Sequence, residues 1–211
     1  MKDIFLSWIQ WSWKWTQADL LLERFPNQFT YFETWAVLRA LSSSDNAIWN
    51  YLRNTVETWW LVKDDVTVAI FWVFLQTVEK WNRLLMDWVL RKLGQTQAIC
   101  AKMKKAGRDF VVLHFDLPDE KVYERLASRI VCEECGNNAN CGEVWQKCSK
   151  CWWLLIRRKD DSNIEAIKTR ISAFHKDTMP WLKWVEEQGW LVHIHADRSV
   201  EEIFNDVVKY I

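Results

Sequence analysis

Short apolar runs and longer segments with helical spacing alternate along the chain. The short runs have the length of strands and lie at residues 3–6, 27–32, 83–87, 110–117 and 190–196. Helical spacing occurs at residues 18–25, 48–56, 66–78, 118–130, 164–175 and 200–211. The run at 110–117 is typical of a strand covered on both faces of a parallel sheet. Together these patterns predict an α/β fold with a five-stranded parallel sheet flanked by helices.

The stretch at 7–17 joins the first strand to the first helix and reads Ser-Trp-Ile-Gln-Trp-Ser-Trp-Lys-Trp-Thr-Gln. A strand, a tight loop with Lys-x-Thr and a helix form the layout of a phosphate-binding loop, whose backbone N–H groups surround the phosphates. Such a loop needs glycine where backbone approach or unusual conformation is required. The corresponding positions here are Trp8, Trp11, Trp13 and Trp15. With glycine there, the stretch resembles the adenylate kinase loop G-x-P-G-x-G-K-G-T-Q, with Gln10 in place of proline.

The composition of the chain also indicates that tryptophan stands where glycine is expected. The chain has 17 tryptophans and 5 glycines in 211 residues, whereas average glycine usage of about 7% predicts roughly 15. Our hypothesis is that most of these tryptophan codons encode glycine in the source organism, through a reassigned UGA codon. The alternative is a truly tryptophan-rich protein. Its loop should bind ATP poorly, because indoles at Trp13 and Trp15 would occupy the space for phosphate.

Net charge and cysteine usage limit the classes of partner. The formal net charge is zero, and charged residues make up 27% of the chain, so no basic field indicates nucleic acid or an anionic membrane. No stretch reaches the ~18 apolar residues of a membrane span, and the N-terminus lacks a signal-peptide pattern. We expect a cytoplasmic monomer without nucleic-acid or membrane partners. In that compartment the six cysteines are expected to be metal ligands or free thiols.

Two further segments resemble the AMP side of the adenylate kinase family. Residues 33–39, Glu-Thr-Trp-Ala-Val-Leu-Arg, match S-T-G-D-[ML]-[LF]-R at Thr34 and Arg39. Residues 57–65 resemble the connection that lines the adenine pocket, which implies a role for Trp60, Leu61 and Val62. Considered without the resemblance, Thr34 would cap a helix, Arg39 would be solvated, and Leu61 and Val62 would be core residues.

Residues 87–95 resemble D-G-[FY]-P-R-x-x-x-Q of the same family. Asp87, Arg91 and Gln95 keep the spacing, and Trp88 falls on the glycine. Leu90 replaces the proline, so the stiffness of the loop is reduced. Asp87 ends a strand, where its carboxylate suits water bound to magnesium, or it caps the next turn.

Arginines lie before and after a cysteine-rich segment. Arg125 and Arg129 lie four residues apart on a predicted helix, which favours the same side, and they match the family's R-x-x-x-R; two solvated arginines are the alternative. Cys132-x-x-Cys135 and Cys148-x-x-Cys151 have the spacing of a tetrahedral structural zinc site, with Cys141 as a spare thiol. Arg158 matches the lid exit L-x-x-R-x-D-D, and Arg170 matches the next family arginine.

The resemblance covers essentially the whole chain. It implies a P-loop NTPase-like core at 1–33, 64–128 and 162–211, a small helical NMP-binding insertion at 34–63 and a zinc-bearing lid at 129–161. The implied enzyme is an adenylate kinase, a phosphotransferase that reversibly moves the γ-phosphoryl group of ATP to AMP, giving two ADP, with Mg²⁺. One alternative is a related kinase for UMP, CMP or GMP, although Leu61, Val62 and Gln95 favour adenine. The other is a catalytically dead nucleotide-fold protein stabilised by zinc.

The resemblance also implies a role for each matching residue. The implied catalytic residues are Lys14, Arg91, Arg129, Arg158 and Arg170. ATP binding is implied for Trp11, Ser12, Trp13, Lys14, Trp15, Thr16, Arg125 and Arg129. AMP binding is implied for Thr34, Arg39, Trp60, Leu61, Val62, Trp88, Arg91, Gln95, Arg158 and Arg170. Thr16 and Asp87 would serve magnesium, and Cys132, Cys135, Cys148 and Cys151 would hold structural zinc.

Overall fold

The computed structural model describes residues 2–8, 14–42, 47, 50, 62–87, 89–135, 138–139, 144–157 and 164–211. Its strands are β1 (Asp3–Trp8), β2 (Phe29–Glu33), β3 (Arg83–Asp87), β4 (Phe110–Asp116), β5 (Ile130–Cys132), β6 (Asn138–Ala139), β7 (Leu155–Arg157) and β8 (Leu191–His195). Its helices are α1 (Lys14–Arg24), α2 (Thr34–Ser42), α4 (Asp64–Thr77), α5 (Leu93–Lys105), α6 (Asp119–Ala127), α7 (Ile164–Asp177), α8 (Met179–Glu187) and α9 (Val200–Val208).

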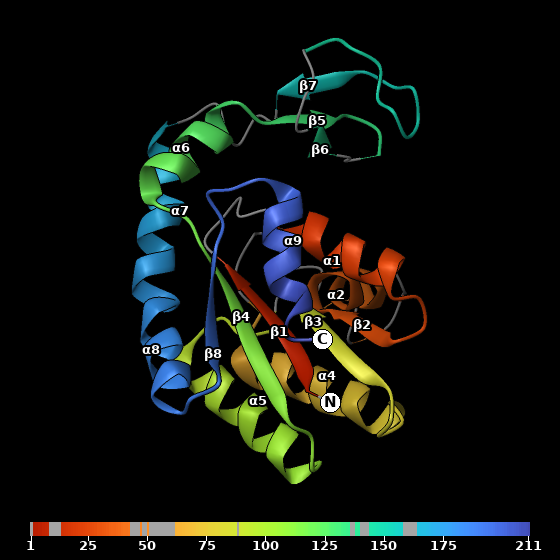
Figure 1. Ribbon diagram of the computed structural model, residues 1–211, viewed down its shortest axis with the longest axis vertical. Coiled ribbons are helices and arrows are strands. Elements are labelled where there is room, and N and C mark those ends of the chain that lie inside the picture. The colour runs from red at the N-terminus through yellow and green to blue at the C-terminus, as the bar shows by residue number, and fades with distance from the viewer. Residues whose placement is uncertain are drawn as a thin grey trace.

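A five-stranded sheet in the order β2-β3-β1-β4-β8 forms the centre of the molecule, and every neighbouring pair is parallel (Figure 1). The central strand β1 pairs on both sides, with Phe5 opposite Met86 of β3 and Val112 of β4. The predicted five-stranded parallel sheet flanked by helices is therefore confirmed. The fold is consistent with that of P-loop NTPases.

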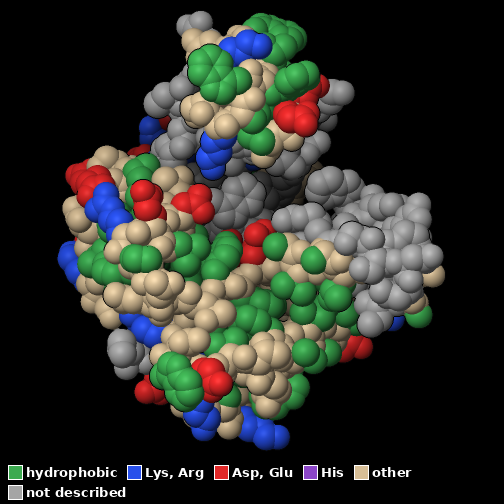
Figure 2. All heavy atoms as spheres, turned by 90° about the vertical axis from the view of Figure 1, so that its right-hand side faces the viewer, with side chains coloured by type: hydrophobic (Ala, Val, Ile, Leu, Met, Phe, Trp, Pro, Cys, Tyr) green, Lys and Arg blue, Asp and Glu red, His purple; other side chains and the backbone are tan. Residues whose placement is uncertain are grey.

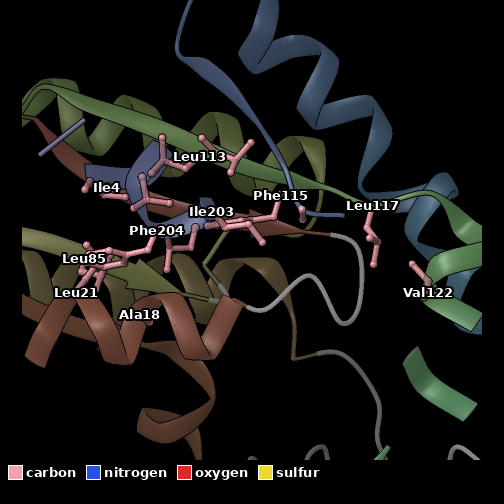
Figure 3. Packing of buried hydrophobic residues seen from close by; sticks show 14 of the residues in the cluster. Ile4, Ala18, Leu21, Leu85, Leu113, Phe115, Leu117, Val122, Ile203 and Phe204 are labelled. Atoms are coloured by element: carbon pink, nitrogen blue, oxygen red, sulfur yellow. The ribbon is translucent and has the colours of Figure 1, made fainter. Parts of the chain in front are cut away.

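Helices cover both faces of this sheet, and each face has its own buried cluster. Successive side chains of a strand point to opposite faces, so Ile4 joins one cluster and Phe5 joins the other. The first cluster packs β1, β3 and β4 against α1, α6, α7 and α9 (Figure 3). The second packs the opposite face against α4, α5 and α8. The two layers bury both faces of the sheet, so that a ligand can reach it only at its edges.

A buried ion pair lies at the amino-terminal edge of the central sheet, opposite the carboxyl ends of its strands. The carboxylate of Asp3 accepts two hydrogen bonds from Arg108, at 2.6 Å from Nε and 3.0 Å from Nη2. It also accepts the backbone N–H of Leu84 at 2.8 Å. Asp3 on β1 thereby fixes the start of β3 and the turn that precedes β4.

A second, antiparallel sheet in the order β6-β5-β7 stands apart from the central sheet, beyond the end of α6 (Figure 1). Its described buried cluster consists of Ile130, Cys132, Cys148 and Leu155, with Val144 packed against it. We call this unit, residues 130–157 as far as they are described, the lid sheet, after the lid expected at 129–161; its described residues lie at the top of the molecule in Figure 1 and Figure 2.

Several element boundaries differ from the prediction. The helix predicted at 18–25 begins at Lys14, and the helix predicted at 118–130 ends at Ala127, so that Ile130 lies in β5. No helix was predicted at 93–105 or 179–187, where the structure has α5 and α8. Of the helix predicted at 48–56, the structure describes only Asn50, whose backbone is helical. Of the helices that are described, none is both long and apolar enough to cross a bilayer.

Candidate nucleotide site at the carboxyl edge of the sheet

Strand order identifies the edge at which a ligand site is expected. From β1 the chain moves outward to β2, returns through β3 and then crosses β1 to reach β4. In open parallel sheets, ligands bind outside the carboxyl ends of the strands where the winding direction reverses. That point lies at the ends of β1, β3 and β4. The segment that connects β1 to α1, residues 9–13, lies outside the described residues, and of Lys14 and Trp15 only the backbone, in the first turn of α1, is described.

Asp87 ends β3 at this edge and is completely buried. The phenol of Tyr31, on β2, donates to Asp87 Oδ2 at 3.2 Å. Burial raises the pKa of Tyr31, and the charges of Asp87 and Glu33 raise it further. The phenol therefore stays protonated and orients the carboxylate. Nothing in the sequence pattern had singled out Tyr31, although its position in β2 opposite β3 follows from the strand register.

Thr34 is the first residue of α2, at the carboxyl end of β2. Its side chain is buried, and within the described part of the chain Oγ1 has no hydrogen-bond partner. A buried hydroxyl without a partner costs free energy, and the N–H groups of a helix N-terminus attract anions. The predicted alternative, in which Thr34 caps the helix through its side chain, finds no such hydrogen bond here.

Arg91 and Gln95 are brought together by a local turn before α5. The backbone N–H of Arg91 donates to Gln95 Oε1 at 2.9 Å, and Gln95 is buried. Burial lowers the pKa of Arg91 to about 10, and the charge of Asp177 on α7 opposes this. The guanidinium thus keeps its charge at neutral pH in a poorly solvated position, where a phosphate would interact with it strongly.

Arg125 and Arg129 lie where α6 passes into the lid sheet. Arg125 donates to the carbonyl of Ala196 at 3.0 Å and lies 3.5 Å from Asp197, in the segment after β8. Burial lowers the pKa of Arg125, and Asp197 partly restores it. Arg129 is buried, but it does not share a helix face with Arg125, because α6 ends at Ala127. The predicted spacing argument was wrong for this pair.

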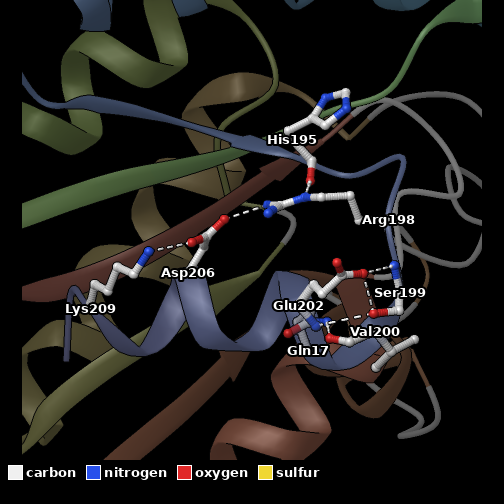
Figure 4. Close-up of polar contacts among 8 residues, drawn as sticks. All are labelled: Gln17, His195, Arg198, Ser199, Val200, Glu202, Asp206 and Lys209. Carbon is white, nitrogen blue, oxygen red and sulfur yellow. Dashed lines mark hydrogen bonds and ion pairs between the residues drawn. The ribbon is translucent and has the colours of Figure 1, made fainter.

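The loop between β8 and α9 is fixed by its own polar contacts (Figure 4). Arg198 bridges the carbonyl of His195 and the carboxylate of Asp206. Ser199 and Glu202 form a reciprocal capping box at the start of α9. Gln17, three residues into α1, donates to the carbonyl of Val200 at 2.9 Å. These contacts join α1, the helix after the predicted phosphate loop, to the helix that closes the chain.

A polar chain also crosses the sheet near its carboxyl edge. Ser7 Oγ lies 3.0 Å from His114 Nδ1, and His114 Nε2 lies 3.4 Å from Asp116 Oδ1. Asp116 Oδ2 is 2.7 Å from Nδ1 of His193 on the edge strand β8. Burial lowers the pKa of His114 to about 4, so the imidazole is neutral at physiological pH. The sequence prediction treated His114 as part of an apolar strand and missed this network.

The four predicted zinc ligands come together in the lid sheet. The Sγ atoms of Cys132, Cys135, Cys148 and Cys151 all lie within 4.8 Å of one another. Cys132 and Cys151 are 3.3 Å apart at Sγ, Cys135 and Cys148 are 3.7 Å apart, and all four are free thiols. The backbone N–H of Cys151 lowers the pKa of Cys148 to about 6, which favours a thiolate at that position. The short separations among the four Sγ atoms suit a tetrahedral metal site.

The structure describes only some of the remaining predicted site residues. Thr16 is half-buried on α1, and Val62 is buried against Leu38 of α2. Trp11, Ser12, Trp13, Trp60, Leu61, Trp88 and Arg158 lie outside the described residues, as does Cys141. Arg39 and Arg170 lie on α2 and α7, but their side chains are not described.

Similarity to known proteins extends along nearly the whole chain. The chain is 28% identical over 199 residues to a protein of Syntrophomonas wolfei, which covers 92% of this chain and 91% of the relative. That relative is an adenylate kinase. Adenylate kinases of Caldicellulosiruptor bescii and Orientia tsutsugamushi are 26% and 29% identical over 203 and 202 residues, covering 93% and 94% of this chain. No protein-family model matches the chain.

Proposed function

We propose that the native protein is an adenylate kinase, which reversibly transfers the γ-phosphoryl group of ATP to AMP in a magnesium-dependent reaction. The observation that carries this proposal is the similarity to adenylate kinases over more than nine-tenths of both chains. The parallel sheet, with buried polar groups at its carboxyl edge, supports it. Phosphoryl transfer requires mainly positioning and neutralisation of charge, and the groups described above suit both tasks.

The ATP side would be formed by the start of α1 and by Asp87. Lys14 would hold the β- and γ-phosphates at the helix N-terminus. The hydroxyl of Thr16, a half-buried residue, and the carboxylate of the fully buried Asp87 are oxygen donors of the kind that Mg²⁺ prefers. Magnesium, when bound with ATP, would neutralise phosphate charge. Tyr31 would keep the Asp87 carboxylate in one orientation through its 3.2 Å hydrogen bond.

The AMP side would use Thr34 and the arginines. The hydroxyl of Thr34, which has no hydrogen-bond partner among the described residues, would gain one when a phosphate lies at the N-terminus of α2, together with Arg39. Arg91, poorly solvated and charged, would bind the phosphoryl group during transfer, with Arg129, Arg158 and Arg170 around it. Trp60, Leu61, Val62, Trp88 and Gln95 would surround the adenine.

The lid sheet would close over ATP and exclude water, which would otherwise accept the phosphoryl group. Arg125 already joins the end of α6 to the loop after β8. A structural zinc on Cys132, Cys135, Cys148 and Cys151 would hold the lid sheet as one rigid unit without contacting nucleotide.

A coupled assay of ADP formation on protein purified from its source cells tests the reaction. Turnover is expected with AMP and to be much weaker with UMP, CMP or GMP, and it should require Mg²⁺. Absence of AMP-dependent turnover, or a preference for another monophosphate, would reject the proposal. The native protein is the proper sample because tryptophan at 11, 13 and 15 would obstruct a phosphate-binding loop.

Thr34→Val and Arg91→Met, made in a chain with glycine at 11, 13 and 15, test the assigned residues. Thr34→Val removes a buried hydroxyl without a described partner, so stability should not fall, while the KM for AMP should rise roughly tenfold. Arg91→Met should lower kcat by roughly a hundredfold. Arg24→Met is the matched control, since Arg24 is exposed at the far end of α1, and it should leave both parameters unchanged.

A further inference from the structure

Five described residues have a backbone φ in the left-handed region. They are Asn27 at 64°, Gly107 at 67°, Gly189 at 74°, Trp145 at 76° and Trp152 at 63°. Glycine reaches this region without steric cost and asparagine tolerates it, whereas a bulky residue there is an outlier. Both tryptophans lie in the lid sheet, so the strain is confined to one small unit.

At Trp152 the left-handed conformation is imposed by the chain around it. Residues 149–151 turn after Cys148, and the N–H of Trp152 closes the turn on the carbonyl of Cys148 at 2.9 Å. The N–H of Cys148 in turn donates to the carbonyl of Trp153 at 2.7 Å. Trp152 is the fifth residue of this turn, and it both donates the closing hydrogen bond and has the left-handed conformation. Where a helical turn ends in this way, glycine usually occupies that fifth position. The indole of Trp152 is 75% exposed, so burial offsets little of the strain.

Trp145 is held in the same way by the neighbouring strand. Its N–H donates to the carbonyl of Leu155 at 2.7 Å, and the N–H of Leu155 donates to Gln146 at 2.9 Å. This paired backbone fixes φ at position 145, while the side chain is 69% exposed. Tryptophan is therefore unexpected at this position, because its side chain is exposed and the hydrogen-bonded backbone holds it in a conformation that favours glycine.

Three other tryptophans pack against neighbouring side chains and have an ordinary backbone conformation. Trp181 is 1% exposed within the cluster against α8, although its ring N–H has no acceptor among the described residues. Trp184 and Trp190 contact each other edge to face at 5.7 Å, and Lys104 lies 4.2 Å above the ring of Trp190. None of the three has a positive φ. Glycine at 181 would leave a cavity the size of an indole.

We propose that positions 145 and 152 are glycine in the native protein and that 181, 184 and 190 are tryptophan. Some positions written as tryptophan are then glycine and others are tryptophan. This happens when two codons are both translated as tryptophan in one genetic code, but one of them encodes glycine in another. In the lid sheet, glycine is inferred from the backbone conformation alone. This evidence is independent of the excess of tryptophan and the shortage of glycine in the whole chain.

Peptide mass spectrometry of the protein from its source cells decides between the two residues. Trypsin separates position 145 in peptide 130–147, position 152 in peptide 151–157 and position 181 in peptide 177–183. The first two are expected to be lighter than the sequence predicts by at least one C9H7N unit, which fragment ions of peptide 151–157 should assign to position 152, and the third should match it. Tryptophan at 145 or 152, or glycine at 181, would overturn the proposal.

Recombinant variants test the conformational reason independently. In the chain as printed, Trp145→Gly and Trp152→Gly should protect the Cys148 amide from exchange roughly fivefold more than Trp145→Ala and Trp152→Ala. The alanine variants remove the indole but keep the steric cost of a positive φ. At position 181, both glycine and alanine should destabilise the protein. Equal protection in the glycine and alanine variants would contradict the assignment. Neither experiment measures phosphoryl transfer, so each can fail while the proposed activity holds.

Discussion

The ion pair at the amino-terminal edge of the sheet gives a prediction whose size follows from its contacts. Asp3 and Arg108 are 5% and 7% exposed at their side chains, and two hydrogen bonds join them. Asp3→Ala would leave the guanidinium buried with the carbonyls of Asn82 and Glu79 as acceptors, and Leu84 N–H would lose its acceptor. Loss of one partner from a buried pair costs about 3–5 kcal/mol. The two remaining carbonyls place the expected loss near the lower end, about 3 kcal/mol.

Urea denaturation followed by circular dichroism measures this loss, which should also lower Tm by roughly 6–12 °C for a chain of this size. Glu201→Ala is the matched control. It breaks the pair with Arg24, which also has two hydrogen bonds, at 2.9 and 3.1 Å, but whose side chains are 45% and 58% exposed. A solvated pair contributes about 1 kcal/mol or less. Equal losses for Asp3→Ala and Glu201→Ala would refute the reasoning from burial.

A double variant separates the pair's net contribution from the cost of an orphaned charge. Asp3→Leu with Arg108→Met replaces both charges by apolar side chains. It should be more stable than Asp3→Ala, because no buried guanidinium is left without its carboxylate. If the double variant is as unstable as the single one, the Leu84 hydrogen bond and local packing carry the effect, and the electrostatic explanation fails.

Three further predictions concern the site and the lid sheet. The unfolded chain protonates His114 below about pH 6.5 but the folded chain only below about pH 4, so stability should fall by about 3 kcal/mol as pH drops through this window, and His114→Gln should flatten the curve in acid denaturation. Cys132→Ser should lower the zinc content after dialysis, measured by atomic emission, whereas Cys100→Ala, outside the cluster, should not. Tyr31→Phe removes the donor to Asp87 and should raise the Mg²⁺ concentration needed for half-maximal turnover, by roughly tenfold; an unchanged requirement would exclude this role.

The central sheet could be predicted because its strands are short, apolar and separated by turn residues. The strand predicted at 83–87 has those bounds in the structure, and the predicted strand at 110–117 ends only one residue earlier. Helix ends were less certain because neighbouring structure determines them. Ile130 continues the helical spacing of α6, yet it pairs in β5 opposite Arg157, where the lid sheet buries it.

The candidate site was predictable only where spacing alone carries the information. Four cysteines in two Cys-x-x-Cys pairs converge as expected. The contact between Tyr31 and Asp87 depends on the register of β2 and β3, and the chain from Ser7 to His193 depends on the order of β1, β4 and β8. Neither can be derived from local pattern, because these partners are brought together only by the assembled sheet.

The small cluster inside the lid sheet has a consequence for how the protein would respond to its cell. Two of its four buried members, Cys132 and Cys148, belong to the thiol group, so the unit has little apolar interior of its own. Zinc, once bound, would supply much of its folding free energy, and by mass action the folded fraction would follow the free zinc concentration. Scarcity of zinc would then unfold the cover of the site first, while the central sheet, with its two large apolar layers, remained intact.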